Sequence, residues 1–353
     1  MRVIFCGKGH FSSAFEYTRD ELLPRDGIEV IEVARDELPN AVEDADVLVP
    51  LMSKLTADLL SRCKKLKLIN QFGVGLEGVD LQKASAMDVP VCKIPSDETG
   101  NAQSCAEMCL LLCLTLLRQM PALQSSVRSG KLGVPTTGTL FKANVLIYGF
   151  GGIGLQLALR LQNFGCSAIR AVSRSGKVPF ANKEDNEKTV DELMIEKMLA
   201  EGIVDLGTTE AQYHEFAATT DVVFLCLPQT ADNMEFVDEK FIRALKKGAI
   251  IINVSRGGLV NYEDVVKCLN DAHLSGFGTD VFKHEPFPRP PLNDSDEVDP
   301  LWEEHKAFLE HPRVVCTPHV AGVTRVSYKR MATLMAQNIL NIVAEKDVEG
   351  KVN

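Results

Sequence analysis

The chain has 353 residues, 45% of them hydrophobic and 24% charged, which is the composition of an ordinary globular protein and a length that suits two domains. Its formal net charge of −10 disfavours a broad contact with nucleic acid or an anionic membrane, because both need clustered Lys and Arg. No apolar run is long enough to cross a bilayer, since the best candidate, residues 108–117, has about half the required length.

Short β-branched runs alternate with amphipathic helical stretches along the chain, a pattern that predicts the α/β class with doubly wound parallel sheets. The first expected strand begins at Arg2 and leaves no room for a secretory signal, so a cytoplasmic protein is expected. The first group of strands is expected at residues 3–6, 29–33, 47–51, 68–71 and 89–94.

A long helix is expected over residues 102–119, with Asn101 as its cap and Pro121 marking its end. The second group of strands is expected at residues 145–148, 168–172, 222–225, 249–254, 276–281 and 314–316. Six strands suit a complete dinucleotide-binding fold. A last helix, 327–343, is assigned to the first domain, so we expect a substrate-binding domain of residues 1–103 and 320–353 and a cofactor domain of residues 104–319.

Two segments interrupt this rhythm, 176–215 and 287–306, and we interpret both as surface insertions. The ten cysteines have neither a disulfide framework nor paired CxxC units typical of zinc, so they are expected to be reduced. Cys105, Cys109 and Cys113 recur at helical spacing without an interleaved His, which favours small buried thiols over a ligand stripe. No metal site is expected.

The sequence GFGGIG follows the expected strand 145–148 directly and opens a helical pattern. Gly149 permits the tight turn, Gly151 lets the backbone approach a pyrophosphate, and Gly154 allows a helix to pack closely on the strand. The helix N-terminus offers unpaired N–H groups and a partial positive charge to phosphates. The expected cofactor contacts of this loop are Gly149, Gly151, Gly152, Ile153 and Gly154.

At the end of the next strand an NAD enzyme normally places a carboxylate on the ribose hydroxyls, but this chain has Ser173, Arg174 and Ser175. A guanidinium and two hydroxyls can bind a 2′-phosphate. The prediction is therefore NADP(H) in preference to NAD, with a solvated Arg174 and a weakly discriminating site as the alternative.

Polar side chains follow three strands of the second group: Arg256, Glu285 and His319. Ligands of open parallel sheets bind beyond the carboxyl ends of the strands, where carbonyl reduction would need a proton donor and an electrostatic anchor. His319 could donate the proton, Glu285 could orient and charge the imidazole, and Arg256 could hold a substrate carboxylate. Taken singly, each residue also fits an ordinary structural or surface role.

The sequence resembles the D-isomer-specific 2-hydroxyacid dehydrogenase family over most of its length. The resemblance rests on five segments: NVSRGG (253–258), TDVFKHEP (279–286), TPHVAG (317–322), GVG (73–75) followed by Val79 and Asp80, and NAQSCAE (101–107). It implies two Rossmann-like domains with the active site in the cleft between them, and a small 2-oxo or 2-hydroxy acid as substrate. It also implies a homodimer with the helix after Asn101 at the interface.

From the resemblance, Arg256 is carried over as substrate anchor and Glu285 with His319 as the acid/base pair. The backbone at Gly73, Val74 and Gly75 is implied as a carboxylate nest. Further cofactor contacts are implied for Ser104, Cys226, Leu227, Pro228, Val254 and Asp280, the last near the nicotinamide amide. For Asp280 a cap at the strand end is the alternative.

The family admits several functions. A glyoxylate or hydroxypyruvate reductase using NADPH is favoured, with NAD as the other cofactor. A phosphoglycerate dehydrogenase-like enzyme is one alternative, although no regulatory domain follows the last expected helix. A cofactor-sensing scaffold without turnover is the other, disfavoured because the chain has neither a long disordered tail nor a basic patch.

Overall fold

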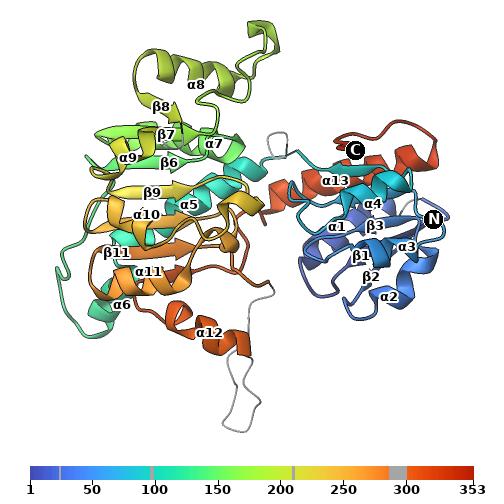
Figure 1. The fold of residues 1–353 in the computed structure, drawn as a ribbon, viewed down its shortest axis with the longest axis horizontal. Coiled ribbons are helices and arrows are strands. Elements are labelled where there is room, and N and C mark those ends of the chain that lie inside the picture. Colours follow the sequence, from blue (N-terminus) through green and yellow to red (C-terminus); the bar gives the residue numbers. More distant parts are fainter. Residues whose placement is uncertain (24, 96–98, 209–210, 286–299) are drawn as a thin grey trace. The chain divides into compact units, whose positions relative to one another are not determined.

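A computed structural model describes residues 1–23, 25–95, 99–208, 211–285 and 300–353 of the chain. It divides into a first unit, Met1–Asn101 with Gly322–Asn353, and a second unit, Ala102–Ala321. Each unit is built on one parallel sheet with helices packed on both faces (Figure 1). The predicted fold class is therefore confirmed.

The first unit has a five-stranded sheet in the order β2-β1-β3-β4-β5. Its strands are β1 (Arg2–Cys6), β2 (Glu29–Val33), β3 (Val47–Val49), β4 (Leu68–Gln71) and β5 (Val91–Lys93). Its helices are α1 (Ser12–Leu22), α2 (Leu38–Ala41), α3 (Ala57–Ser61), α4 (Leu81–Ala86) and α13 (Arg325–Val343). Alternate residues of β1 face opposite sides, so Val3 packs with α1 and α13 while Ile4 packs with α2, α3 and α4.

The second unit has a seven-stranded sheet in the order β12-β11-β10-β9-β6-β7-β8. Its strands are β6 (Asn144–Tyr148), β7 (Ala168–Ser173), β8 (Val204–Thr208), β9 (Val222–Leu225), β10 (Ala249–Asn253), β11 (Leu274–Thr279) and β12 (Val314–Cys316). Every ladder in it is parallel, so the carboxyl ends of all seven strands lie along one edge.

Two helical layers cover this sheet. One layer contains α5 (Asn101–Leu117), α7 (Gly152–Leu161) and α8 (Val190–Ala200), and the other contains α9 (Ala211–Ala217), α10 (Glu239–Ala244), α11 (Tyr262–Asn270) and α12 (Pro300–Leu309). Ile250 and Ile252 of β10 pack into the first layer, whereas Ile251 packs into the second. The unbroken apolar run of β10 is thus the signature of a strand buried on both faces.

The prediction of six strands in the second unit was wrong, as was the interpretation of residues 176–215 as a surface insertion. The segment contains α8 and β8, and β8 extends the sheet by pairing with β7. Ile195 and Met198 of α8 are buried in the core. A capping box between Thr189 and Glu192 starts α8, because each side chain accepts a hydrogen bond from the other residue's backbone N–H.

The helix expected at 102–119 is shorter than predicted and is followed by a second helix. Asn101 is the first residue of α5, which ends at Leu117, and α6 (Met120–Arg128) starts after Gln119 in the left-handed region (φ 47°). Pro121 lies in the first turn of α6, where a missing N–H costs no hydrogen bond. Proline therefore opens a helix here, contrary to the prediction that it marks an end.

Part of the segment expected as the second insertion, residues 287–299, lies outside the described residues. The remainder belongs to α12, where Trp302 and His305 are buried, so this part is not a surface insertion. All ten cysteines are free thiols, and Cys105, Cys109 and Cys113 are buried as predicted. Burial raises the pKa of Cys105 to about 12.

Within the described residues, no single helix has the length and hydropathy of a membrane span. Helices α5 and α6 meet that criterion only when taken together, and they are bent by 53° at the break between them.

Candidate active site

The loop Gly149–Gly154 joins β6 to α7, and its backbone conformation and packing require glycine at two positions. A Cβ on Gly149, whose φ is +104°, would lie 2.5 Å from the carbonyl oxygen of Cys226. A Cβ on Gly154 would lie 2.3 Å from the carbonyl oxygen of Gly149. Both distances are shorter than atoms tolerate, so the turn and the close packing of α7 on the sheet need residues without side chains.

The same loop leaves space where a phosphate would lie. Gly151 is the N-cap of α7, no side chain caps the helix, and a Cβ on Gly151 would meet nothing within 4 Å. The N-terminus of α7 thus presents backbone N–H groups beside open space, with no acidic residue in its first turn. This arrangement fits the pyrophosphate of a dinucleotide.

Beyond β7, the adenosine end of such a cofactor would meet Ser173, Arg174 and Ser175. Arg174 is exposed, and its guanidinium makes no ion pair or hydrogen bond with another described residue. The Ser173 hydroxyl donates to the carbonyl of Lys177, and the backbone N–H of Lys177 donates to the Ser175 hydroxyl, both at 3.3 Å. The turn is cationic, and the last residue of β7 and the two that follow it include no carboxylate.

Further predicted cofactor contacts, apart from Asp280, lie in or directly after three elements of the second unit. Ser104 lies in the first two turns of α5, and Val254 is buried directly after β10. Cys226, Leu227 and Pro228 follow β9, where the backbone N–H of Cys226 donates to the carbonyl of Tyr148 (2.8 Å). This bond holds the segment beside the glycine loop.

The three predicted catalytic residues follow three neighbouring strands. The register pairs Asn253 of β10 with Thr279 of β11, and Thr279 with Cys316 of β12. Arg256 comes three residues after Asn253. Glu285 comes six residues after Thr279, and His319 comes three residues after Cys316. The sheet therefore delivers all three side chains to the same stretch of its carboxyl edge.

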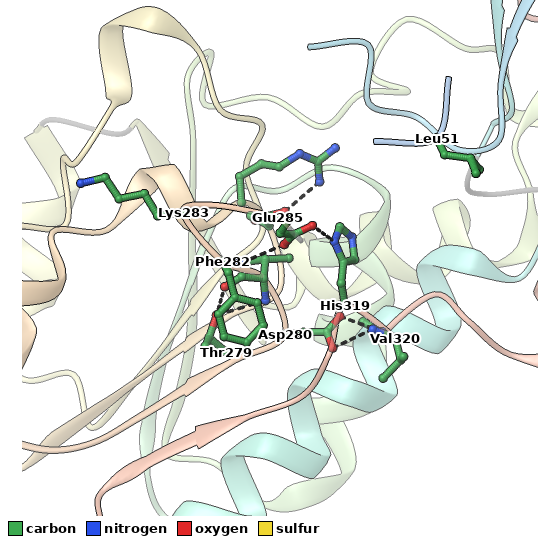
Figure 2. A network of polar contacts seen from close by, with 12 residues as sticks. Leu51, Thr279, Asp280, Phe282, Lys283, Glu285, His319 and Val320 are labelled. Atoms are coloured by element: carbon green, nitrogen blue, oxygen red, sulfur yellow. Dashed lines mark hydrogen bonds and ion pairs between the residues drawn. The ribbon is translucent and has the colours of Figure 1, made fainter. Parts of the chain in front are cut away.

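Glu285 and His319 form a direct pair. His319 Nδ1 lies 2.6 Å from Glu285 Oε2, and the backbone N–H of Phe282 donates to Glu285 Oε1 (2.8 Å), as Figure 2 shows. The side chains are only 24% and 12% exposed, so solvent screens the pair weakly. His319 has a φ of +54°, an uncommon backbone conformation for a non-glycine residue.

Asp280 holds the loop that carries His319. Its Oδ1 accepts hydrogen bonds from the Thr317 hydroxyl (2.6 Å) and the Val320 backbone N–H (2.9 Å), and its Oδ2 accepts from the Ala321 N–H (2.7 Å). Burial raises the pKa of this fully buried carboxyl, and the three hydrogen bonds oppose that rise by stabilising the charged form. The predicted contact with the nicotinamide amide stays a prediction.

Arg256 stands on a turn that a neighbouring side chain shapes. The buried amide of Asn253 accepts from the backbone N–H of Ser255 (3.0 Å) and donates to the carbonyl of Arg256 (2.9 Å). A Cβ on Gly257 would lie 1.9 Å from the backbone of Phe282. The Arg256 turn is thus packed against the segment whose Phe282 N–H binds Glu285, which links all three residues through short contacts.

In the first unit, Gly73, Val74 and Gly75 follow β4. Gly73 has a φ of +140°, and Val74 is 47% exposed. The amide of Gln71 donates to the carbonyls of Leu51 and Gly75, both at 2.8 Å, which fixes the turn. The turn is preformed, and its predicted role in binding a carboxylate stays a prediction.

Two supporting residues, Gln71 and Asn253, were not predicted from the sequence, and Asp280 was predicted as a cap at the strand end only as an alternative to a cofactor contact. Each is a polar residue at the end of a buried strand, with a side chain that is at most 7% exposed. A buried polar group must find hydrogen-bond partners, so polarity at the end of an apolar strand was the available signal. Their partners could not be read from the sequence.

Comparison with known proteins gives a family and a fold. A family model described as D-isomer specific 2-hydroxyacid dehydrogenase, NAD binding domain, matches residues 110–202 and 196–321. Glyoxylate reductase of Thermococcus onnurineus is 28% identical over 319 residues, which cover 88% of this chain and 83% of that protein. D-3-phosphoglycerate dehydrogenase of Sus scrofa is 26% identical over 339 residues, which cover 94% of this chain but only 56% of that protein.

Solved structures agree with this result. The TT0316 protein of Thermus thermophilus superposes over the full length of both chains with a TM-score of 0.76 and 25% identity. D-lactate dehydrogenase of Aquifex aeolicus, solved with NAD and lactic acid, covers 97% of this chain with a TM-score of 0.77 and 22% identity. At that identity the second likeness concerns the fold alone.

Proposed function

Because this chain belongs to the D-isomer specific 2-hydroxyacid dehydrogenase family, we propose that it reduces a small 2-oxo acid to its D-2-hydroxy acid, in the manner of a glyoxylate or hydroxypyruvate reductase with NADPH. The observation that carries the proposal is the 2.6 Å contact between Glu285 and His319 at the carboxyl edge of the second sheet. A bound reduced nicotinamide supplies the hydride to the substrate carbonyl carbon.

The proton comes from His319 in this proposal. The donor is the doubly protonated form of His319. Its Nδ1–H donates to Glu285, since a carboxylate can only accept hydrogen bonds, and its Nε2–H is the proton delivered to the carbonyl oxygen, which leaves a neutral imidazole. The negative charge that develops on that oxygen is also stabilised by Arg256, whose fork of donors suits the substrate carboxylate as well. In the reverse direction His319 accepts the proton from the hydroxy acid. The turn at Gly73–Gly75 is the proposed second contact of the substrate carboxylate.

The glyoxylate or hydroxypyruvate assignment is tested with a panel of 2-oxo acids assayed with NADPH and NADH. The panel contains glyoxylate, hydroxypyruvate, pyruvate and 3-phosphohydroxypyruvate. Steady turnover with highest kcat/KM on the first two supports the assignment. A preference for the phosphorylated acid would favour the phosphoglycerate dehydrogenase-like alternative, and nucleotide binding without turnover on any of them would favour a cofactor-sensing scaffold.

Arg174 is the proposed ligand of the 2′-phosphate of NADPH. Arg174→Ala is expected to raise KM for NADPH about 10- to 100-fold, because hydrogen bonds to a charged group contribute about 1.5–3 kcal/mol. KM for NADH should change little, since NADH has no 2′-phosphate. Steady-state kinetics with both cofactors measure the difference.

Arg330→Ala provides the control, because Arg330 is an exposed arginine on α13 of the first unit. Its KM values should equal those of the unaltered protein. An unaltered protein that prefers NADH, or an Arg174→Ala variant with unchanged KM for NADPH, would overturn the proposed cofactor specificity.

We further propose a homodimer whose interface includes α5, α6 and the segment after them. Exposed apolar side chains gather in this part of the chain: Leu111 (55% exposed), Val127 (80%), Leu132 (99%) and Phe141 (60%). Apolar side chains that form a contiguous exposed patch mark protein interfaces, and we propose that these four residues contribute to such a patch. Light scattering should therefore give twice the chain mass of 38.8 kDa, and Val127→Glu should shift the mass toward the monomer. A monomeric unaltered protein would contradict this proposal.

A further inference from the structure

Three potential metal ligands meet beside the segment that carries Glu285. They are His284, Glu304 and His305, and their nearest ligand atoms all lie within 4.8 Å of one another. His284 adjoins Glu285 in the chain, whereas Glu304 and His305 belong to α12. None of these three side chains takes part in the proposed reaction.

His305 is the unusual member of this cluster. The residue is 1% exposed, and neither of its ring nitrogens has a hydrogen-bond partner among the described residues. Buried polar atoms without a hydrogen-bond partner are uncommon, because each one lowers the stability of the folded protein. A bound ligand would remove that cost for the His305 ring. Its Nδ1 lies 3.7 Å from Glu304 Oε1, which aims the unpaired nitrogen into the cluster.

Buried and charged groups surround the His305 ring. Burial lowers the pKa of His305, with smaller contributions in the same direction from His284 and Lys283 and an opposing one from Glu304. Lys283 Nζ lies 4.0 Å from Glu304 but is also paired with Glu235, which partly offsets its charge.

The three ligand atoms lie near one another, but they are farther apart than the ligand atoms around a bound ion. Bonds of about 2.0–2.1 Å in a tetrahedron place ligand atoms about 3.3 Å apart, so the cluster must close by up to about 1.5 Å. The His284 and His305 rings are 19° from parallel, so His284 must turn for its lone pair to converge on the ion. His284 is partly exposed and the Glu304 side chain is 50% exposed, so both can move, while His305 stays packed against Tyr262.

We propose that His284, Glu304 and His305 bind a divalent zinc ion, with water as the fourth ligand. Two imidazoles and a carboxylate are a donor set that zinc accepts in proteins. The ion would connect α12 to the segment that carries Glu285 and would satisfy the unpaired ring of His305. No metal site was expected from the sequence, and its ligands come from two segments that only the fold brings together.

The test is zinc binding by the full-length protein after chelator treatment and removal of the chelator. Equilibrium dialysis against ZnCl₂ with metal analysis should find one tightly bound zinc per chain, and zinc should raise the thermal midpoint. Glu304→Gln and His284→Gln change exposed or partly exposed side chains and should abolish both effects while the proteins stay folded. His214→Gln, an exposed histidine on α9, is the matched control and should behave as the unaltered protein.

Cobalt(II) distinguishes this site from the free thiols. The unaltered protein with CoCl₂ should show the visible bands of a low-symmetry nitrogen and oxygen site, without the near-ultraviolet charge-transfer band of thiolate ligands. Thiolate bands as the main signal would overturn the proposal. The absence of stoichiometric zinc, or full zinc binding by Glu304→Gln and His284→Gln, would overturn it as well. Because none of these readouts needs turnover, failure here leaves the proposed dehydrogenase function intact.

Discussion

Replacing His319 with alanine is expected to lower kcat about a hundredfold or more, because one general acid/base group contributes a factor of that order or larger. Cofactor affinity should be retained, since the glycine loop Gly149–Gly154 makes its own contacts with α7, β6 and Cys226. Steady-state kinetics give kcat, and quenching or enhancement of NADPH fluorescence gives the dissociation constant.

A substitution of Glu285 tests its role separately from that of His319. Glu285→Gln keeps a hydrogen-bonding group beside Nδ1 but removes the charge, so we expect an intermediate loss of kcat. The control is His214→Ala, an exposed histidine of the second unit, which should leave kcat unchanged. An unchanged kcat in His319→Ala would remove the imidazole from the reaction.

Arg256→Ala is expected to lower kcat/KM for the 2-oxo acid about 100- to 1000-fold. The estimate follows from the loss of two hydrogen bonds to charged groups, at about 1.5–3 kcal/mol each and a factor of ten per 1.4 kcal/mol, reduced by partial replacement with water. KM should rise and kcat should fall together, because the guanidinium binds the carboxylate in the ground state and the developing charge in the transition state.

Arg256→Lys tests whether the planar guanidinium or only the positive charge is needed. Lysine keeps the charge but has no planar fork, so it should recover only part of the lost kcat/KM. Denaturant unfolding should give both variants the stability of the unaltered protein. If stability falls while the kinetics of the folded fraction stay the same, Arg256 has a structural role and the proposed anchor is wrong.

The positions of the proposed catalytic residues were predictable because the strands of a parallel sheet all end at one edge. The end of a buried apolar strand can be found in the sequence, and all such ends lie on one edge of a parallel sheet. Arg256, Glu285 and His319 could therefore be placed at that edge. Their convergence on one stretch of it depends on β10, β11 and β12 being neighbours, and only the structure shows this order.

The supporting contacts were not predictable for a related reason. Asp280 lies 37 to 41 residues from the groups whose hydrogen bonds it accepts, and nothing local in its strand indicates them. The errors in the fold were local. Strand β8 includes the exposed Asp205 and a glycine within a charged segment, so its apolar signal is weak. Pro121 was interpreted as a stop, although the first turn of a helix tolerates proline.

The most direct test of the central claim follows the hydride itself. The protein is incubated with hydroxypyruvate and NADPH deuterated at the transferable position of the nicotinamide, and the product is analysed by mass spectrometry and chiral chromatography. We expect D-glycerate that carries deuterium on C2 from the unaltered protein, and about a hundredth of that initial rate or less from His319→Ala. Glycerate of the L configuration, or the same rate of labelled product from both proteins, would contradict the account.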